Sequence, residues 1–141
     1  MGIRLAPRSV DRVKRRLRQM TRRTSGQAVE VVIERLNSYI LGWVGYFRIA
    51  DAKEHLRQLD EHLRRRLRQL VWKQWKTPTN RSRNLRALGV SDFWAIRAGG
   101  TSKGHWRLSA SPPLQKALNN AYWEQRGLVS FLKRYQALRS T

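Results

Sequence analysis

The stretch AKEHLRQLDEHLRRRLRQLVWKQWK, residues 52–76, decides the fold of this 141-residue chain. Its leucines recur every three or four residues, the spacing of one side of a helix, and basic residues fill most other positions. We therefore predict a long amphipathic helix with its leucine side in the core. The helix should end before Pro78, because proline removes a backbone donor and biases the preceding residue away from helix. The leucine side consists of Leu56, Leu59, Leu63, Leu67 and Leu70.

Two more helices are predicted before this stretch. The first begins after Ser9, a good N-cap residue, and carries apolar residues at helical spacing. The second runs from residue 29 to residue 47, with a pause near Asn37 and Ser38. Because Gly42 and Gly45 lower helix propensity, we expect another backbone to approach closely there.

The residues after Pro78 predict shorter helices separated by glycines and prolines. The expected helices cover residues 83–88, 91–98, 112–126 and 131–138, and residues 105–109 are expected to form a short extended piece. No alternation of apolar and polar residues is long enough for a regular strand, so the predicted fold class is all-α. The proline also marks an expected boundary between segments 1–76 and 77–141, which carry net charges of +12 and +9.

The charge of the chain indicates its class of partner. There are 30 Lys and Arg residues against 9 Asp and Glu, a formal net charge of +21. Like charge at this density destabilises a compact fold unless a partner neutralises it, so the composition predicts a polyanion, with nucleic acid first. Arginine, at 23 of the 30, favours shaped recognition because its planar fork binds phosphate at two points. With no Cys and no long apolar run, we expect no disulfide, thiolate metal site or membrane partner.

Basic residues on the first and third predicted helices, and in the later loops, are the candidate phosphate contacts. A solvated helix face is the alternative, but the shortage of compensating acids argues against it. Replacing Arg64, Arg65 and Arg66 together with Gln is expected to weaken binding and to leave helicity nearly unchanged. The candidates are Arg12, Arg15, Arg16, Arg22, Arg23, Arg64, Arg65, Arg66, Arg68, Lys73, Lys76, Arg83, Lys103, His105 and Arg107.

Tryptophan is the other residue type suited to nucleic acid, because its ring can stack on a base. Trp75 and Trp106 stand at the ends of predicted elements beside basic residues, which makes them the candidate stacking platforms. Trp43 and Trp94 stand among aliphatic residues at helical spacing, so we expect both in the core.

Two short patterns resemble catalytic or metal-binding motifs. Residues 100–104, GTSKG, match the G-x-S-x-G nucleophile elbow in letters, but no buried strand precedes the serine, and His105 stands where a phosphate-binding loop needs Lys. His55 and His62 are two helical turns apart, whereas helical metal ligands are usually one turn apart. We therefore assign no catalytic residue, metal site or cofactor.

Residues 36–48, LNSYILGWVGYFR, resemble the signature L-N-P-x-L-R-G-W-x-N-Y-F-R of group II intron reverse transcriptase/maturases. The resemblance spans about Ser9 to the C-terminus, with the maturase-specific signature from about residue 28. It implies a thumb-like three-helix bundle up to residue 76 and then a small helical domain X, which binds structured intron RNA and stabilises its splicing-competent fold. Further matches, in the same order, are residues 59–60, 64–68, 72–76, 83–85, 88–91, 104–109 and 117–122.

The sequence also departs from the family pattern. In the signature, Ser38 replaces Pro, Leu41 replaces Arg and Gly45 replaces Asn. The family's Tyr-x-Asp-Asp palm motif, which carries metal-binding carboxylates, does not occur. We therefore expect a non-enzymatic fragment or remnant of a reverse transcriptase/maturase, with a separate palm-bearing chain as a further partner.

DNA is the alternative polyanion. Residues 83–98 have the outline of a helix-turn-helix around Gly89, although the second helix offers few side chains that read bases. An inactive, degenerate remnant is a third interpretation. We expect a cytoplasmic, bacterial location, and the acid-poor start, residues 1–23, leaves an organellar location as the alternative.

Overall fold

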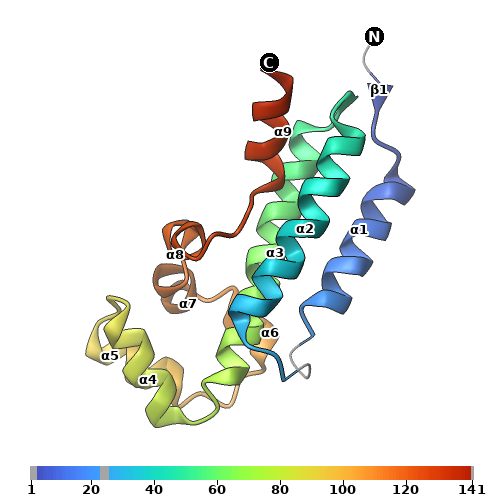
Figure 1. Cartoon of the computed structure of the whole chain (residues 1–141). Coiled ribbons are helices and arrows are strands. Elements are labelled where there is room, and N and C mark those ends of the chain that lie inside the picture. The colour runs from blue at the N-terminus through green and yellow to red at the C-terminus, as the bar shows by residue number, and fades with distance from the viewer. Residues whose placement is uncertain (1–2, 23–25, 141) are drawn as a thin grey trace.

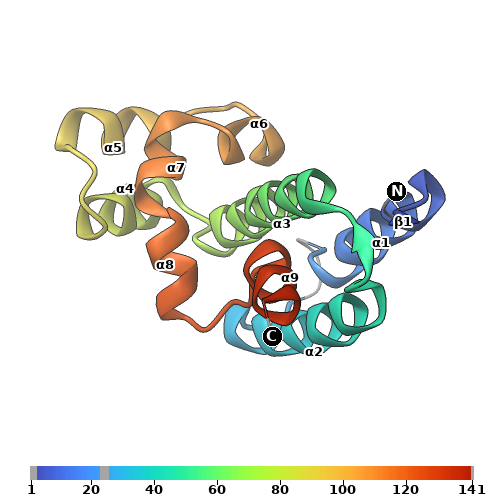
Figure 2. The same cartoon turned by 90° about the horizontal axis from the view of Figure 1, so that it is seen from above.

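The computed structural model describes residues 3–22 and 26–140 of the chain. Helices make up nearly all the regular structure of these residues, which confirms the all-α prediction. A short parallel pair joins β1 (Ile3–Arg4) to β2 (Ala50–Asp51). Figures 1 and 2 show four helices grouped together, α1 (Pro7–Met20), α2 (Val29–Phe47), α3 (Lys53–Gln74) and α9 (Phe131–Arg139), with the five short helices between α3 and α9 on one side of α3.

The predicted long helix is α3 (Lys53–Gln74), and it lies at the centre of the fold. Each leucine of its apolar side is at most 1% exposed. Burying one leucine in this way stabilises the fold by about 1.5–3 kcal/mol relative to leaving it in water. α1 (Pro7–Met20) and α2 (Val29–Phe47) pack against α3, and α9 (Phe131–Arg139) lies between α2 and α3 (Figure 2).

Two polar side chains, one on α3 and one on α2, hold the start of α9 in place. The buried carboxylate of Asp60, on α3, accepts hydrogen bonds from Ser130 Oγ (2.7 Å), Phe131 N (2.8 Å) and Leu132 N (3.1 Å). Asn37, on α2, accepts from Val129 N (2.8 Å) and donates to Gly127 O (2.7 Å). Because the first backbone N–H groups of a helix lack partners within it, Asp60 serves as a cap of α9 from another helix, and Asn37 holds the segment just before α9.

Five short helices lie between α3 and α9, and side-chain caps mark the starts of two of them. Thr77 Oγ1 accepts from Asn80 N (3.2 Å), and Asn119 Oδ1 accepts from Tyr122 N (2.9 Å). Gly89 and Gly127 have φ angles of 96° and 83°, which suit glycine at helix ends. The helices are α4 (Pro78–Ala87), α5 (Asp92–Gly99), α6 (His105–Ser109), α7 (Pro112–Ala117) and α8 (Asn120–Gln125).

Several local predictions are wrong in the first half of the chain. α1 begins at Pro7 after Ala6, which provides no side-chain cap, so Ser9 lies inside the helix. α2 runs without a pause, since Asn37 uses its side chain to bind the segment before α9. A Cβ atom added at Gly42 or Gly45 would meet nothing within 4 Å. Among the described residues, no other backbone segment therefore comes close to these two exposed glycines.

Other predictions are wrong in the second half. Residues 105–109 form the helix α6 instead of an extended piece. The predicted helix over 112–126 is divided into α7 and α8, because Asn119 ends one and caps the next. The close backbone approach occurs at Gly99, where an added Cβ would lie 2.2 Å from Ser82 Oγ and 2.8 Å from Pro78 O. Glycine is therefore required where α5 crosses α4.

The division of the chain at residue 76 stays a prediction. α3, from the first segment, packs against both α6 and α9 from the second. None of the described helices combines the length and the apolar character needed to cross a membrane.

Candidate nucleic-acid interface

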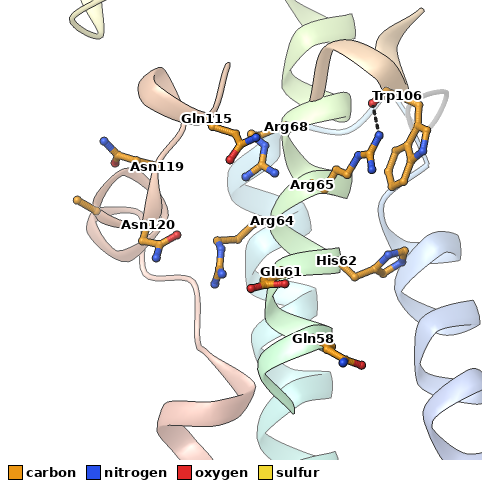
Figure 3. Close-up of a pocket in the computed structure, with 11 residues that line it drawn as sticks. Gln58, Glu61, His62, Arg64, Arg65, Arg68, Trp106, Gln115, Asn119 and Asn120 are labelled. Atoms are coloured by element: carbon orange, nitrogen blue, oxygen red, sulfur yellow. Dashed lines mark hydrogen bonds between the residues drawn. The ribbon is translucent and has the colours of Figure 1, made fainter. Parts of the chain in front are cut away.

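A groove of about 820 Å³ lies between α3 and the short helices α6, α7 and α8 (Figure 3). Arginines of α3 line one wall, and amide side chains of α7 and α8 line the other. Guanidinium and amide groups both suit a ligand with phosphate and hydroxyl groups. The lining residues are Gln58, Glu61, His62, Arg64, Arg65, Arg68, Trp106, Gln115, Asn119, Asn120 and Ala121.

Two of the groove arginines are held in place by the protein itself. Arg65 donates to Trp106 O (3.0 Å) and Ser109 Oγ (3.1 Å), and its guanidinium lies 3.8 Å from the centre of the Trp106 ring. Arg68 Nε donates to Ser109 O at 2.5 Å. These bonds fasten α6 to α3. They also leave the remaining N–H groups of both side chains in fixed directions.

The charge of Arg68 lies in surroundings that disfavour it. Burial, and then repulsion by Arg64 and Arg65, lower its pKa to about 10. The side chain is still a cation at neutral pH, because that value lies well above 7. A bound anion would relieve the repulsion among the three guanidinium groups, so the groove favours an anionic ligand.

Arg64 and Asn120 are the groove residues best placed to meet a ligand. Figure 3 shows Arg64 extending from α3 toward the wall that carries Asn120. Neither side chain has a hydrogen-bond partner among the described residues. Glu61 is the one acid among the lining residues, against three arginines, and its carboxylate is paired with Arg57 Nη1 at 2.5 Å. The groove therefore presents uncompensated positive charge.

Arg66, the middle member of the predicted basic cluster, faces the opposite side of α3. It donates to Arg18 O (3.1 Å), Thr21 Oγ1 (3.1 Å) and Gln69 Oε1 (3.2 Å). These bonds tie the end of α1 to α3. Three arginines that look equivalent in the sequence thus have three different surroundings: Arg64 faces the groove, Arg65 holds α6 and Arg66 holds α1.

The outer face of α1 provides a second basic surface. Arg12, Arg15, Arg16 and Arg22 are exposed, and Arg16 donates a long hydrogen bond to Gln19 Oε1 (3.4 Å). Arg23 lies outside the described residues. We define the α1 surface by Arg12, Arg15 and Arg16.

The remaining predicted basic residues are dispersed. Lys73 is half-buried near the end of α3, and Lys76 and Arg83 are exposed. His105 Nε2 lies 3.3 Å from Arg81 Nη2. Lys103 and Arg107 line a separate cavity beside α5. The structure therefore brings Arg64, Arg65 and Arg68 together in the groove and leaves these others apart from it.

The tryptophans differ from the prediction in one important case. Trp43 is half-buried and packs edge-on against Phe131 (5.7 Å between ring centres), as expected for a core residue. Trp75 is half-buried against Trp72, and Trp106 lies beneath Arg65. Trp94 was predicted in the core but is 54% exposed. The buried side of α5 carries small residues instead, because α4 packs too closely for a large ring.

His62 lies at the edge of the groove but faces away from Arg64, toward Trp106 and α1 (Figure 3). Its Nε2 atom is buried and has no hydrogen-bond partner among the described residues. Burial lowers its pKa to about 4, helped by repulsion from Lys14, Arg66, Arg18 and Arg65. Within the described residues, no three His, Asp or Glu side chains cluster so as to hold a metal ion.

Comparison with known proteins identifies the first half of the fold. The family described as "Group II intron, maturase-specific domain" matches residues 10–89, more than half of the chain. No curated protein matches the chain. The match covers most of α1 and all of α2, α3 and α4, and it confirms the resemblance seen in the sequence. The arginine wall of the groove lies inside the matched region, and the amide wall lies outside it.

Proposed function

The chain belongs to the group II intron maturase-specific domain family, and from this premise we propose that it binds structured intron RNA and stabilises the fold in which that RNA splices. The family is defined by a non-catalytic domain, so the proposal requires no chemical step by this chain. The observation that carries the proposal is the groove, which is lined by three arginines of α3 and by the amides of α7 and α8.

Structured RNA fits this groove better than other polyanions do. An RNA duplex offers proteins its phosphates and 2′-hydroxyls, because the base edges of its deep groove are inaccessible. Guanidinium groups bind the phosphates, and amides such as that of Asn120 bind hydroxyls, which both donate and accept. Because Arg65 and Arg68 are already held by hydrogen bonds, they lose little rotamer freedom on binding.

The α1 surface supplements the groove. Arg12 and Arg15 have no hydrogen-bond partner among the described residues, so their full charge is available for attraction to phosphate. If about six phosphates are engaged in total, affinity should fall by about three orders of magnitude between 50 and 200 mM salt. We assign attraction to the α1 surface and shape recognition to the groove.

A binding competition tests the proposal. Folded group II intron RNA and an unrelated DNA duplex of equal charge compete for the protein at several salt concentrations. We expect intron RNA to bind more tightly at every salt concentration. Equal or stronger binding of the duplex would contradict the proposal and favour the helix-turn-helix alternative, in which α5 enters the DNA groove.

Single substitutions then locate the interface. Arg64→Gln should weaken intron RNA binding, because it removes a groove cation that the fold does not use. Arg134→Gln is the matched control, since Arg134 is exposed on α9 and lies outside the groove lining. Equal effects of the two variants would mean that the groove is not the binding site. A palm-bearing partner chain and a cytoplasmic location stay predictions.

A further inference from the structure

The outer side of α5 presents large apolar side chains to solvent. Phe93, Trp94 and Ile96 are 58%, 54% and 59% exposed. The family match ends at residue 89, so the match does not account for this patch. Apolar side chains exposed together on a chain of high charge indicate a binding surface.

Trp94 stands at the meeting point of two cavities. One, of about 330 Å³, lies between α5 and α7, where Pro112 and Pro113 form the other wall. The second, of about 520 Å³, shares Trp94 and both prolines. The basic residues Arg97, Lys103 and Arg107 line this second cavity. The mainly apolar cavity between α5 and α7, called the slot below, thus adjoins the basic cavity.

The exposed rings are held in position by each other and by a cation. Trp94 and Phe93 make an edge-to-face contact with ring centres 5.1 Å apart and planes at 82°. The Arg97 guanidinium lies 5.2 Å from the Phe93 ring centre and 5.8 Å from that of Trp94. Such contacts restrict side-chain rotation, so the Trp94 ring is partly ordered before any ligand arrives.

We propose that Trp94 is a stacking platform for an unpaired RNA base, with the flanking phosphates bound by Arg97, Lys103 and Arg107. The inference rests on the proposed function and adds a second contact, to single-stranded RNA, beyond the groove. Aromatic rings next to cations are how proteins bind single-stranded nucleic acid, because every base has a face that can stack.

Charge complementarity favours this occupant over others. No carboxylate lines either cavity, and the neighbouring Asp92 lies within ion-pair distance of Arg86 (4.0 Å). A second copy of this chain would bring another +21 charge against the first, so self-association through the patch is disfavoured. An unpaired nucleotide supplies an apolar face for the slot and an anion for the basic cavity.

The test uses the full chain and a short RNA hairpin that carries an unpaired tail containing one 2-aminopurine, a base whose fluorescence falls on stacking. Trp94→Ala should lower the affinity for this RNA about tenfold, the effect of losing one base stack. Trp94→Phe should retain most of the affinity, because a ring remains. The matched control is Tyr46→Ala, which removes a ring that is 78% exposed on α2.

The salt dependence separates stacking from charge. Trp94→Ala should lower affinity by the same factor at every salt concentration, whereas Arg97→Gln should also reduce the salt slope by about one. The 2-aminopurine signal should fall on binding to the wild-type chain and to Trp94→Phe, and should stay high with Trp94→Ala.

Each outcome bears on the inference. If Trp94→Ala binds the tailed hairpin as the wild-type chain does, the stacking site is wrong, while a loss in Arg64→Gln still supports the groove. If neither the hairpin nor intron RNA is preferred over duplex DNA, the proposed function fails first. Trp94→Ala could instead leave RNA affinity unchanged and abolish self-association or binding to anionic lipid vesicles. Either result would overturn the inference, because the patch would then bind a second copy of the chain or a membrane.

Discussion

The arginines of the groove and those of the α1 surface are the same residue in two physical states. In the groove, Arg65 and Arg68 donate to atoms of α6 before any ligand is present. On α1, Arg12 and Arg15 extend into solvent. The groove arginines lose side-chain conformational entropy when the protein folds, and the α1 arginines lose it when RNA binds. Held arginines therefore recognise shape, and exposed ones supply long-range attraction.

Removing the charge of the α1 surface should have the largest effect on intron RNA binding. We expect the triple substitution Arg12→Gln, Arg15→Gln and Arg16→Gln to lower intron RNA affinity about 100-fold at low salt, or about 3 kcal/mol. The salt slope should fall by about two to three, because each lost phosphate contact removes about one. Filter binding across a salt series measures both. A thermal melt should be unchanged, and a shifted melt would show that these residues also hold the fold.

Removing a held arginine should affect the fold itself. Arg65→Ala removes the hydrogen bonds to Trp106 O and to the buried Ser109, so we expect the free energy of unfolding to fall by about 2 kcal/mol. Urea unfolding measures the change. Arg64→Ala is the control and should leave the unfolding midpoint in place. Equal midpoints for Arg65→Ala and the wild-type chain would contradict the assignment of Arg65 as a residue that holds α6 to α3.

His62 links the groove wall to acid stability. Its pKa of about 4 in the folded chain lies below the ordinary value of 6.5, so the unfolded chain binds more protons between those values. The free energy of unfolding should therefore be at its full value above pH 6.5. It should fall by about 1–2 kcal/mol as the pH drops to about 4, a figure reduced for solvent screening of this partly exposed group. Urea unfolding of the wild-type chain and of His62→Leu over this pH range isolates the effect. Identical pH profiles would contradict it.

The smallest expected effect separates guanidinium shape from charge. Arg64→Lys keeps the charge but loses the planar fork, so we expect intron RNA affinity to fall a few-fold with an unchanged salt slope. Arg15→Lys should leave intron RNA affinity almost unchanged, because attraction at the α1 surface depends on charge alone. Equal losses at the two positions would show that both surfaces work in the same way.

The sequence predicted the long helices because their burial repeats with the helical period. The five leucines between Leu56 and Leu70 lie on one side of α3, and their spacing alone predicts the helix without any knowledge of distant residues. The roles of Arg65 and Arg66 were not predictable, since their partners Ser109 and Thr21 are more than forty residues away in the chain. Local spacing cannot show which arginine will meet a carbonyl of another helix.

Trp94 shows a second limit of sequence patterns. Large apolar residues at helical spacing usually belong to a core, but in α5 the buried side is made by Ala95, Ala98 and Gly99. The reason is the short distance between α4 and α5, which leaves no room even for a Cβ at Gly99. The glycine pair Gly99-Gly100 was the available signal. It indicates that the small residues, and not the aromatic ones, face the neighbouring helix.

The capping of α9 by Asp60 has a consequence for the order of events during protein synthesis. The first three helices emerge from the ribosome long before α9, yet α9 packs between α2 and α3. Until then, part of the apolar surface of α2 and the carboxylate of Asp60 lack their partners. The growing chain must therefore carry an unfinished core past the ribosome exit, where chaperones act on exposed apolar surface. Among these four helices, α9 and the hydrogen bond from Ser130 to Asp60 are therefore expected to take their places last.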